Sequence, residues 1–168
     1  MVRSVGNEIA LAAYVFPLVM AGLSDLRSLR IPNWLTGAFA LAFLPTALLF
    51  GGGAVDWLSH LAAGGAVFLG AATLFALRLM GGGDVKLLAA VALWIGLGSL
   101  LPFLVLTAVI GGGLAAVVLL LRAPIMQAAL VRVLPRLAEV ARKKMPVPYG
   151  VPIAAAGIMM LPSLAFLA

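Results

Sequence analysis

Residues 87–121 read LLAAVALWIGLGSLLPFLVLTAVIGGGLAAVVLLL, a stretch that contains no charged side chain. One crossing of the hydrocarbon core of a membrane needs about 20 apolar residues, within a range of roughly 17–25. The stretch is too long for one crossing, and Gly96, Gly98 and Pro102 offer a place where the chain can reverse. We therefore interpret it as two transmembrane helices that form a tight hairpin.

The composition of the whole chain is typical of a protein that lipid surrounds. Of the 168 residues, 65% are hydrophobic and 10% are charged, and the mean hydropathy is +1.24. A soluble domain would have about 25% charged residues. Cysteine is absent and His60 is the single histidine, which excludes disulfides, a cysteine nucleophile and Cys- or His-rich metal sites. The net charge of +6 is not arranged as a basic stripe with aromatics, so we expect no nucleic acid partner.

Apolar segments of suitable length recur along the chain. We predict an all-α fold: a polytopic membrane protein with about six transmembrane helices, in a single membrane-embedded domain over residues 1–168. The predicted spans are 6–24, 34–51, 57–79, 85–99, 101–121 and 149–167.

The basic residues set the orientation of these spans, because cytoplasmic loops are enriched in Lys and Arg. If both termini lie outside, ten of the eleven Lys and Arg residues fall on the cytoplasmic side and only Arg3 lies outside. An alternative is that the first 24 residues form a cleaved signal peptide. Arg3 and the apolar run after Ile9 fit that alternative. Glu8 does not, because a signal peptide begins with a positively charged region and Glu8 is acidic.

The long polar segment 124–145 predicts an amphipathic helix. Its apolar side chains recur at alternating spacings of four and three residues, its charged side chains follow another face, and Pro135 would bend it. We expect this helix to lie on the cytoplasmic membrane surface and to contact anionic lipid. A substrate-docking arm is the alternative interpretation.

Two aspartates, Asp25 and Asp84, are prominent in a chain with only five acidic residues. The predicted topology places Asp25 at the end of the first helix and Asp84 at the start of the fourth, both at the cytoplasmic boundary. Placing a carboxylate beside hydrocarbon costs free energy, so its presence there indicates a functional site. If the two helices pack together, the carboxylates can share one proton and activate water for attack on a peptide carbonyl, as in aspartic proteolysis.

Each aspartate also has a purely structural interpretation. Asp84 could cap its helix by accepting backbone N–H groups, and Asp25 could be a solvated boundary residue paired with Arg27 or Arg30. The shared depth of the two aspartates favours the functional interpretation. So do the three glycines before Asp84, because glycine removes side chains where an extended substrate would approach.

Three short blocks of this sequence resemble those of a known family. Gly81-Gly82-Gly83-Asp84 resembles the GxGD element of aspartyl proteases that work in membranes. Asp25 with Ile31-Pro32-Asn33 resembles the first block of type IV prepilin peptidases, and Pro148-Tyr149-Gly150 resembles the block that opens their last helix. Chain length and the number of spans are similar to the short, peptidase-only branch that serves tight-adherence (Flp-type) pili.

The resemblance implies an aspartic endopeptidase of the bacterial inner membrane, with its active site on the cytoplasmic side. Its partners would be prepilin or pseudopilin substrates, from which it removes the leader. Asp25 and Asp84 would be the catalytic pair, without a metal or other cofactor. The residues expected to bind substrate or shape the site are Pro32, Asn33, Gly81, Gly83, Lys86, Tyr149 and Gly150. Lys86 could lower the pKa of Asp84 or merely mark the cytoplasmic side.

Larger relatives also methylate the new amino terminus, and many carry an insertion with paired CxxC motifs. Because this chain has no cysteine, we expect neither zinc nor methyltransferase activity. Two alternatives remain open: a GxGD protease with substrates other than pilins, and a non-enzymatic ion-handling or assembly protein. The second is disfavoured because a transporter would bury charge near the midplane, where this sequence has none.

Overall fold

The computed structural model describes residues 2–51, 55–124, 126 and 147–164. All regular structure in these ranges is helical, which confirms the predicted all-α class. In chain order the elements are α1 (Val2–Ser28), α2 (Asn33–Phe50), α3 (Trp57–Ala76), α4 (Gly82–Ile95), the 3-10 helix η1 (Leu97–Ser99), α5 (Leu100–Arg122), α8 (Gly150–Met159) and the 3-10 helix η2 (Leu161–Ser163). The amphipathic helix predicted over 124–145 lies outside the described residues, apart from residues 124 and 126.

Four segments are long and apolar enough to cross a membrane, which supports a polytopic membrane protein. They lie within α1, α2, α3 and the stretch Leu97–Arg122. The predicted spans 85–99 and 149–167 correspond to shorter helices, α4 with 14 residues and α8 with 10. Helix α4 ends early because Gly96 adopts a φ of +74°, a conformation open to glycine.

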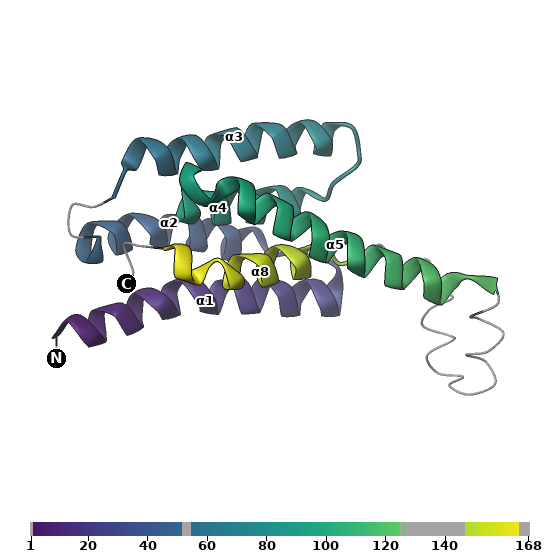
Figure 1. Cartoon of the computed structure of the whole chain (residues 1–168), viewed down its shortest axis with the longest axis horizontal. Helices are drawn as coiled ribbons and strands as arrows, with labels where there is room; N and C mark the ends of the chain where they lie inside the picture. The colour runs from purple at the N-terminus through teal and green to yellow at the C-terminus, as the bar shows by residue number, and fades with distance from the viewer. Residues whose placement is uncertain (1, 52–54, 125, 127–146, 165–168) are drawn as a thin grey trace.

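Consecutive helices alternate in direction: α1, α3 and α5 run one way, and α2, α4 and α8 run the other (Figure 1). One end of the bundle therefore carries the loops 29–32 and 77–81 together with the start of α8; we call it the loop end. The last turns of α5 extend beyond the other helices there.

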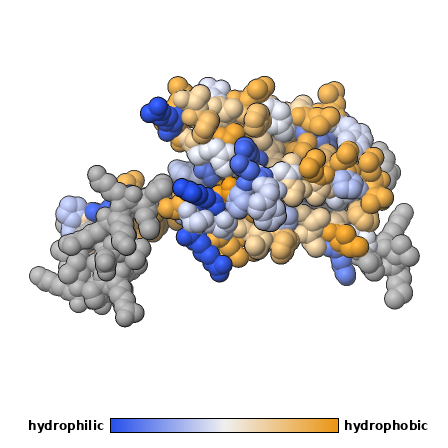
Figure 2. Space-filling model, turned by 180° about the vertical axis from the view of Figure 1, so that it is seen from behind, coloured by the Kyte–Doolittle hydropathy of each residue, from blue (hydrophilic) through white to orange (hydrophobic). Residues whose placement is uncertain are grey.

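Polar surface is concentrated at the loop end. Figure 2 shows hydrophilic residues gathered toward this end of the bundle, while most of the remaining surface on that face is apolar. The exposed basic residues there include Arg27, Arg30, Arg78 and Lys86. A basic loop end next to apolar helices is the pattern expected where a membrane protein meets one aqueous compartment.

Aromatic packing and two hydrogen bonds hold the helices that carry the loop end. The rings of Tyr14, Phe39 and Trp94 are buried, with centroids 5.3–5.6 Å apart, and join α1, α2 and α4. The Tyr14 hydroxyl donates to the carbonyl of Gly157 in α8 at 2.8 Å, and Trp94 Nε1–H donates to the carbonyl of Phe39 at 2.9 Å. Lipid offers no partners for such groups, so these bonds fix α8 against α1 and α2 against α4.

Helix α3 ends in a Schellman motif with Arg78 in the left-handed conformation. Arg78 has a φ of +59°; its N–H donates to the carbonyl of Phe75, and Leu79 N–H donates to the carbonyl of Leu74, both at 2.9 Å. Glycine usually occupies this position, because a side chain there costs about 1–2 kcal/mol.

Replacing Arg78 with glycine is therefore expected to stabilise the protein. Arg78→Gly should raise the free energy of unfolding by about 1 kcal/mol by removing this strain, measured by unfolding in detergent micelles. The matched control is Arg27→Gly in the last turn of α1, where glycine should lower it by roughly 0.5–1 kcal/mol. If both variants were destabilised by a similar amount, Arg78 would not be strained in its left-handed conformation.

Candidate active site

Asp25 lies inside α1, one turn before the helix ends at Ser28, rather than after the predicted span 6–24. Its side chain is only 5% exposed, and its Oδ2 accepts the backbone N–H of Gly150 at 2.7 Å. Gly150 is the first residue of α8, and the first N–H groups of a helix have no partner within the helix. Asp25 therefore completes the N-terminus of α8, where the helix dipole favours a negative charge.

Asp84 is the third residue of α4, just before the predicted span 85–99. Its carboxylate accepts a hydrogen bond from the backbone N–H of Gly81, the N-cap residue of the helix. The expected capping role is thus present. Burial, and then the charge of Asp25, raise the pKa of Asp84 to about 6. Asp84 is therefore close enough to Asp25 to feel its charge.

Both aspartates line one cavity of about 480 Å³ at the loop end. The rest of its wall comes from the turn after α1, the turn after α3 and the segment before α8. These residues are Leu29, Arg78, Leu79, Met80, Gly81, Val147 and Tyr149. The structure therefore brings five predicted positions near one another: Asp25, Asp84, Gly81 and Tyr149 in the wall, and Gly150 bonded to Asp25.

A Cβ at any of three motif glycines would crowd a neighbouring side chain. A Cβ on Gly150 would lie 2.9 Å from Asp25 Oδ2 and 2.7 Å from Ile31 Cδ1, and one on Gly83 would lie 3.2 Å from Ile31 Cβ. A Cβ on Gly81 would lie 2.8 Å from Asp84 Oδ2. Ile31 is thus enclosed between two motif glycines, and it joins the three sequence blocks at the loop end.

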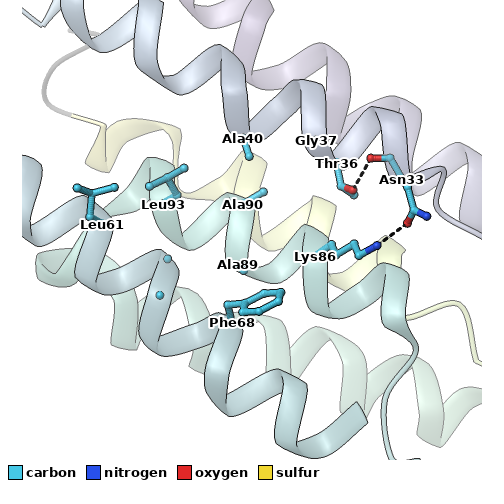
Figure 3. Close-up of a pocket in the computed structure, with 12 residues that line it drawn as sticks. Asn33, Thr36, Gly37, Ala40, Leu61, Phe68, Lys86, Ala89, Ala90 and Leu93 are labelled. Carbon is cyan, nitrogen blue, oxygen red and sulfur yellow. Dashed lines mark hydrogen bonds between the residues drawn. The ribbon is translucent and has the colours of Figure 1, made fainter. Parts of the chain in front are cut away.

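Pro32, Asn33 and Lys86 do not line the aspartate cavity. Pro32 is the N-cap residue of α2, with an extended backbone. Lys86 Nζ donates to Asn33 Oδ1 at 2.9 Å, and both side chains line a separate, mostly apolar cavity of about 550 Å³ between α2, α3 and α4 (Figure 3). The structure brings Lys86 and Asn33 to each other, on the side of α4 away from Asp84.

Several residues of the aspartate cavity were not predicted from the sequence. Leu29 and Arg78 both line it, and both have a positive φ, of 53° and 59°. Non-glycine residues with such angles often cluster at functional sites. The available signal was weak: Arg78 is a basic residue three positions before Gly81, and Leu29 has no sequence feature that singles it out.

A comparison with protein families bears on this site. The model of the type IV leader peptidase family matches residues 12–116. The chain belongs to this family. The matched region of this leader peptidase includes both aspartates and the glycines before Asp84, whereas Tyr149 and Gly150 lie beyond it. No curated protein and no solved structure shows significant similarity.

Membership of the family establishes the broad activity. The protein is a membrane-embedded peptidase, a hydrolase whose family acts on prepilin-like substrates. The predicted resemblance to prepilin peptidases is therefore confirmed at the level of the family. The Flp-type branch remains a prediction.

Proposed function

We propose that this leader peptidase is an aspartic endopeptidase in which Asp25 and Asp84 together activate the water that cleaves the leader from a prepilin or pseudopilin. The observation that carries the proposal is the shared cavity, which the buried Asp25 and the half-buried Asp84 both line and in which the charge of Asp25 raises the pKa of Asp84. Two nearby carboxylates cannot both ionise cheaply, so the pair holds one proton at a pH below about 6, the pKa of Asp84. That is the state that acid–base hydrolysis of a peptide requires.

The chemical step uses both members of the pair. The ionised carboxylate takes a proton from water as the water oxygen attacks the peptide carbonyl carbon, and the protonated carboxyl donates its proton to the carbonyl oxygen. The resulting gem-diol collapses: the C–N bond breaks, one hydroxyl proton returns to a carboxylate, and the leaving nitrogen receives a proton. The hydrogen bond from Gly150 to Asp25 and that from Gly81 to Asp84 hold the carboxylates in position throughout.

The surroundings support cleavage at the cytoplasmic face of the bacterial inner membrane. Arg27, Arg30, Arg78 and Lys86 are exposed at the loop end, and positive residues mark the cytoplasmic side of membrane proteins. The peptide would enter between the turns that follow α1 and α3, where Gly81 leaves the approach to Asp84 free of a side chain.

Cleavage of a purified prepilin by the purified protein tests the proposal. In detergent or liposomes we expect one product shortened by the leader, identified by mass spectrometry at its new amino terminus. Exhaustive chelation should leave the rate unchanged, because the proposed step uses only two carboxylates and water. Strict dependence on a divalent metal, or an intact prepilin after long incubation, would refute the proposal.

The shared proton predicts the pH dependence of the reaction. The pKa of Asp84 is raised to about 6, so we expect kcat/KM to fall as the pH rises through about 6 and the pair loses this proton. A second fall at lower pH should follow when both carboxyls are protonated. The groups facing the pair across the cavity are Arg78 and Tyr149. A kcat/KM that rises steadily from pH 5 to pH 9 would contradict a shared proton.

A further inference from the structure

The cavity of about 550 Å³ between α2, α3 and α4 is a groove in the apolar side of the bundle; we call it the α4 groove. Helices α2 and α3 pack against α4 more than against each other, so α4 forms the floor between them. The walls are mostly small or apolar and include Gly37 and Ala40 from α2, Gly65 and Phe68 from α3, and Ala89 and Leu93 from α4. Gly37, Gly65 and Phe68 are exposed, so the groove opens to the surface that meets lipid. It shares no lining residue with the aspartate cavity.

One end of the α4 groove carries a positive charge. Lys86 is exposed there, and its Nζ donates to Asn33 Oδ1 at 2.9 Å. Leu61 and Leu93 lie toward the other end (Figure 3). Lys86 forms no ion pair within the described part of the chain. An ammonium group has three N–H donors, so two of them remain for another partner.

The length of the α4 groove limits what can fill it. Lys86 and Leu93 are seven residues apart on α4, so the groove runs about 10 Å along this helix from its charged end. One leaflet of the hydrocarbon core is about 15 Å thick, so the groove ends within the leaflet in which it begins. A transmembrane helix of a partner would need a surface about 30 Å long. An acyl chain of one leaflet fits the groove, with its headgroup beside Lys86.

We propose that the α4 groove binds an anionic phospholipid of the leaflet at the loop end, with its phosphate on Lys86 and one acyl chain along the groove. Asn33 holds Lys86 Nζ at this end, and its amide NH₂ offers further donors to the same phosphate. A zwitterionic lipid would fill the groove but would bring a cationic group close to Lys86, so the charge favours an anionic headgroup. Because the lipid would contact α2, α3 and α4 together, its binding should stabilise the folded protein.

Lipid titrations in detergent, with bound lipid counted by native mass spectrometry, test the headgroup contact. Wild type should bind one phosphatidylglycerol more tightly than phosphatidylcholine with the same acyl chains. Lys86→Gln should weaken phosphatidylglycerol binding about 10-fold, the effect of one lost hydrogen bond between charged groups. Arg27→Gln removes an exposed cation outside the groove and should leave the affinity within about twofold of wild type. An equal loss in both variants, or equal affinity of wild type for the two lipids, would overturn the proposal.

Two glycines of α3 test whether the acyl chain lies in the groove. A Cβ on Gly65 or on Gly70 would meet nothing within 4 Å, but only Gly65 lines the groove. Gly65→Leu should fill the groove and weaken phosphatidylglycerol binding roughly 10-fold, because a leucine side chain displaces several methylene groups. Gly70→Leu should leave the affinity near wild type. Equal affinities for the two variants, or displacement of the lipid by excess inorganic phosphate, would show that the anion binds without its chain and would overturn the proposal.

Thermal unfolding gives a readout that does not depend on peptide cleavage. At about ten times its dissociation constant, phosphatidylglycerol should raise the melting temperature of wild type by about 3–6 °C. Lys86→Gln should melt at the wild-type temperature without lipid and show little rise at the same lipid concentration. Lys86→Arg keeps the positive charge and should retain most of the rise. A rise of equal size in wild type and Lys86→Gln would refute Lys86 as the contact of the lipid.

Discussion

Asp25→Asn and Asp84→Asn are each expected to reduce the rate of leader cleavage by roughly 10²–10⁴-fold, the usual contribution of a general acid or base. Asparagine has nearly the same shape as aspartate but can neither take a proton from water nor supply one. Each variant therefore keeps the shape of the cavity wall but removes one of the two carboxylates that share the proton. Single-turnover cleavage of a purified prepilin, followed on gels, measures the effect.

Asp56→Asn is the matched control for these two substitutions. Asp56 is exposed at the N-cap of α3, where its side chain accepts the N–H of Ser59 at 3.1 Å. Asparagine caps helices about as well as aspartate, so both stability and cleavage should stay near wild type. If Asp25→Asn or Asp84→Asn retained more than a tenth of the wild-type rate, that carboxylate would not be part of the hydrolytic pair.

Gly150→Ala is expected to damage the site without changing a charged group. Its Cβ would lie 2.9 Å from Asp25 Oδ2, 3.0 Å from Asp25 Cβ and 2.7 Å from Ile31 Cδ1. The Ile31 side chain and either the start of α8 or the carboxylate must shift, which strains the 2.7 Å bond that Gly150 N donates to Asp25 Oδ2. We expect about a 10²-fold loss in kcat, the effect of misplacing a catalytic group by about 1 Å, and a loss of stability of about 1–3 kcal/mol.

Gly113→Ala provides the comparison, since a Cβ there meets nothing within 4 Å. In the middle of α5, alanine should leave cleavage unchanged and stabilise the helix by roughly 0.5–1 kcal/mol. Thermal unfolding and initial cleavage rates are measured for both variants. Wild-type rates for Gly150→Ala would show that contact between α8 and Asp25 does not position the carboxylate.

The arrangement of helices was largely predictable because apolar length and charge placement are local properties. The helix ends were less so. The span predicted to end at residue 24 continues through Asp25 because Leu29, at a φ of +53°, donates its N–H to the carbonyl of Asp25 and closes the last turn. No residue typical of such a helix end marks this position in the sequence, since glycine usually occupies it.

The site was predictable only in part, because its cavity is formed where segments far apart in the sequence pack together. We expected Asp25 and Asp84 to meet only if the first and fourth helices pack together. Both aspartates line one cavity, although α1 and α4 are joined mainly through α2 and α8, which pack against both. Lys86 was expected to shape the site beside Asp84, but it bonds Asn33 and does not line the aspartate cavity, because residues two apart on a helix face different sides. Arg78 carries only a weak local signal, because its place in the aspartate cavity arises from the turn after α3.

In the proposed mechanism Asp25 and Asp84 act as one unit on one water molecule. A double-mutant cycle tests this coupling, by measuring single-turnover cleavage for wild type, Asp25→Asn, Asp84→Asn and the double variant. Residues that act as a unit are strongly non-additive, so the double variant should cleave no more slowly than the slower single variant. A double variant slowed by the product of the two single effects would show that the carboxylates act independently, and would contradict the proposed mechanism.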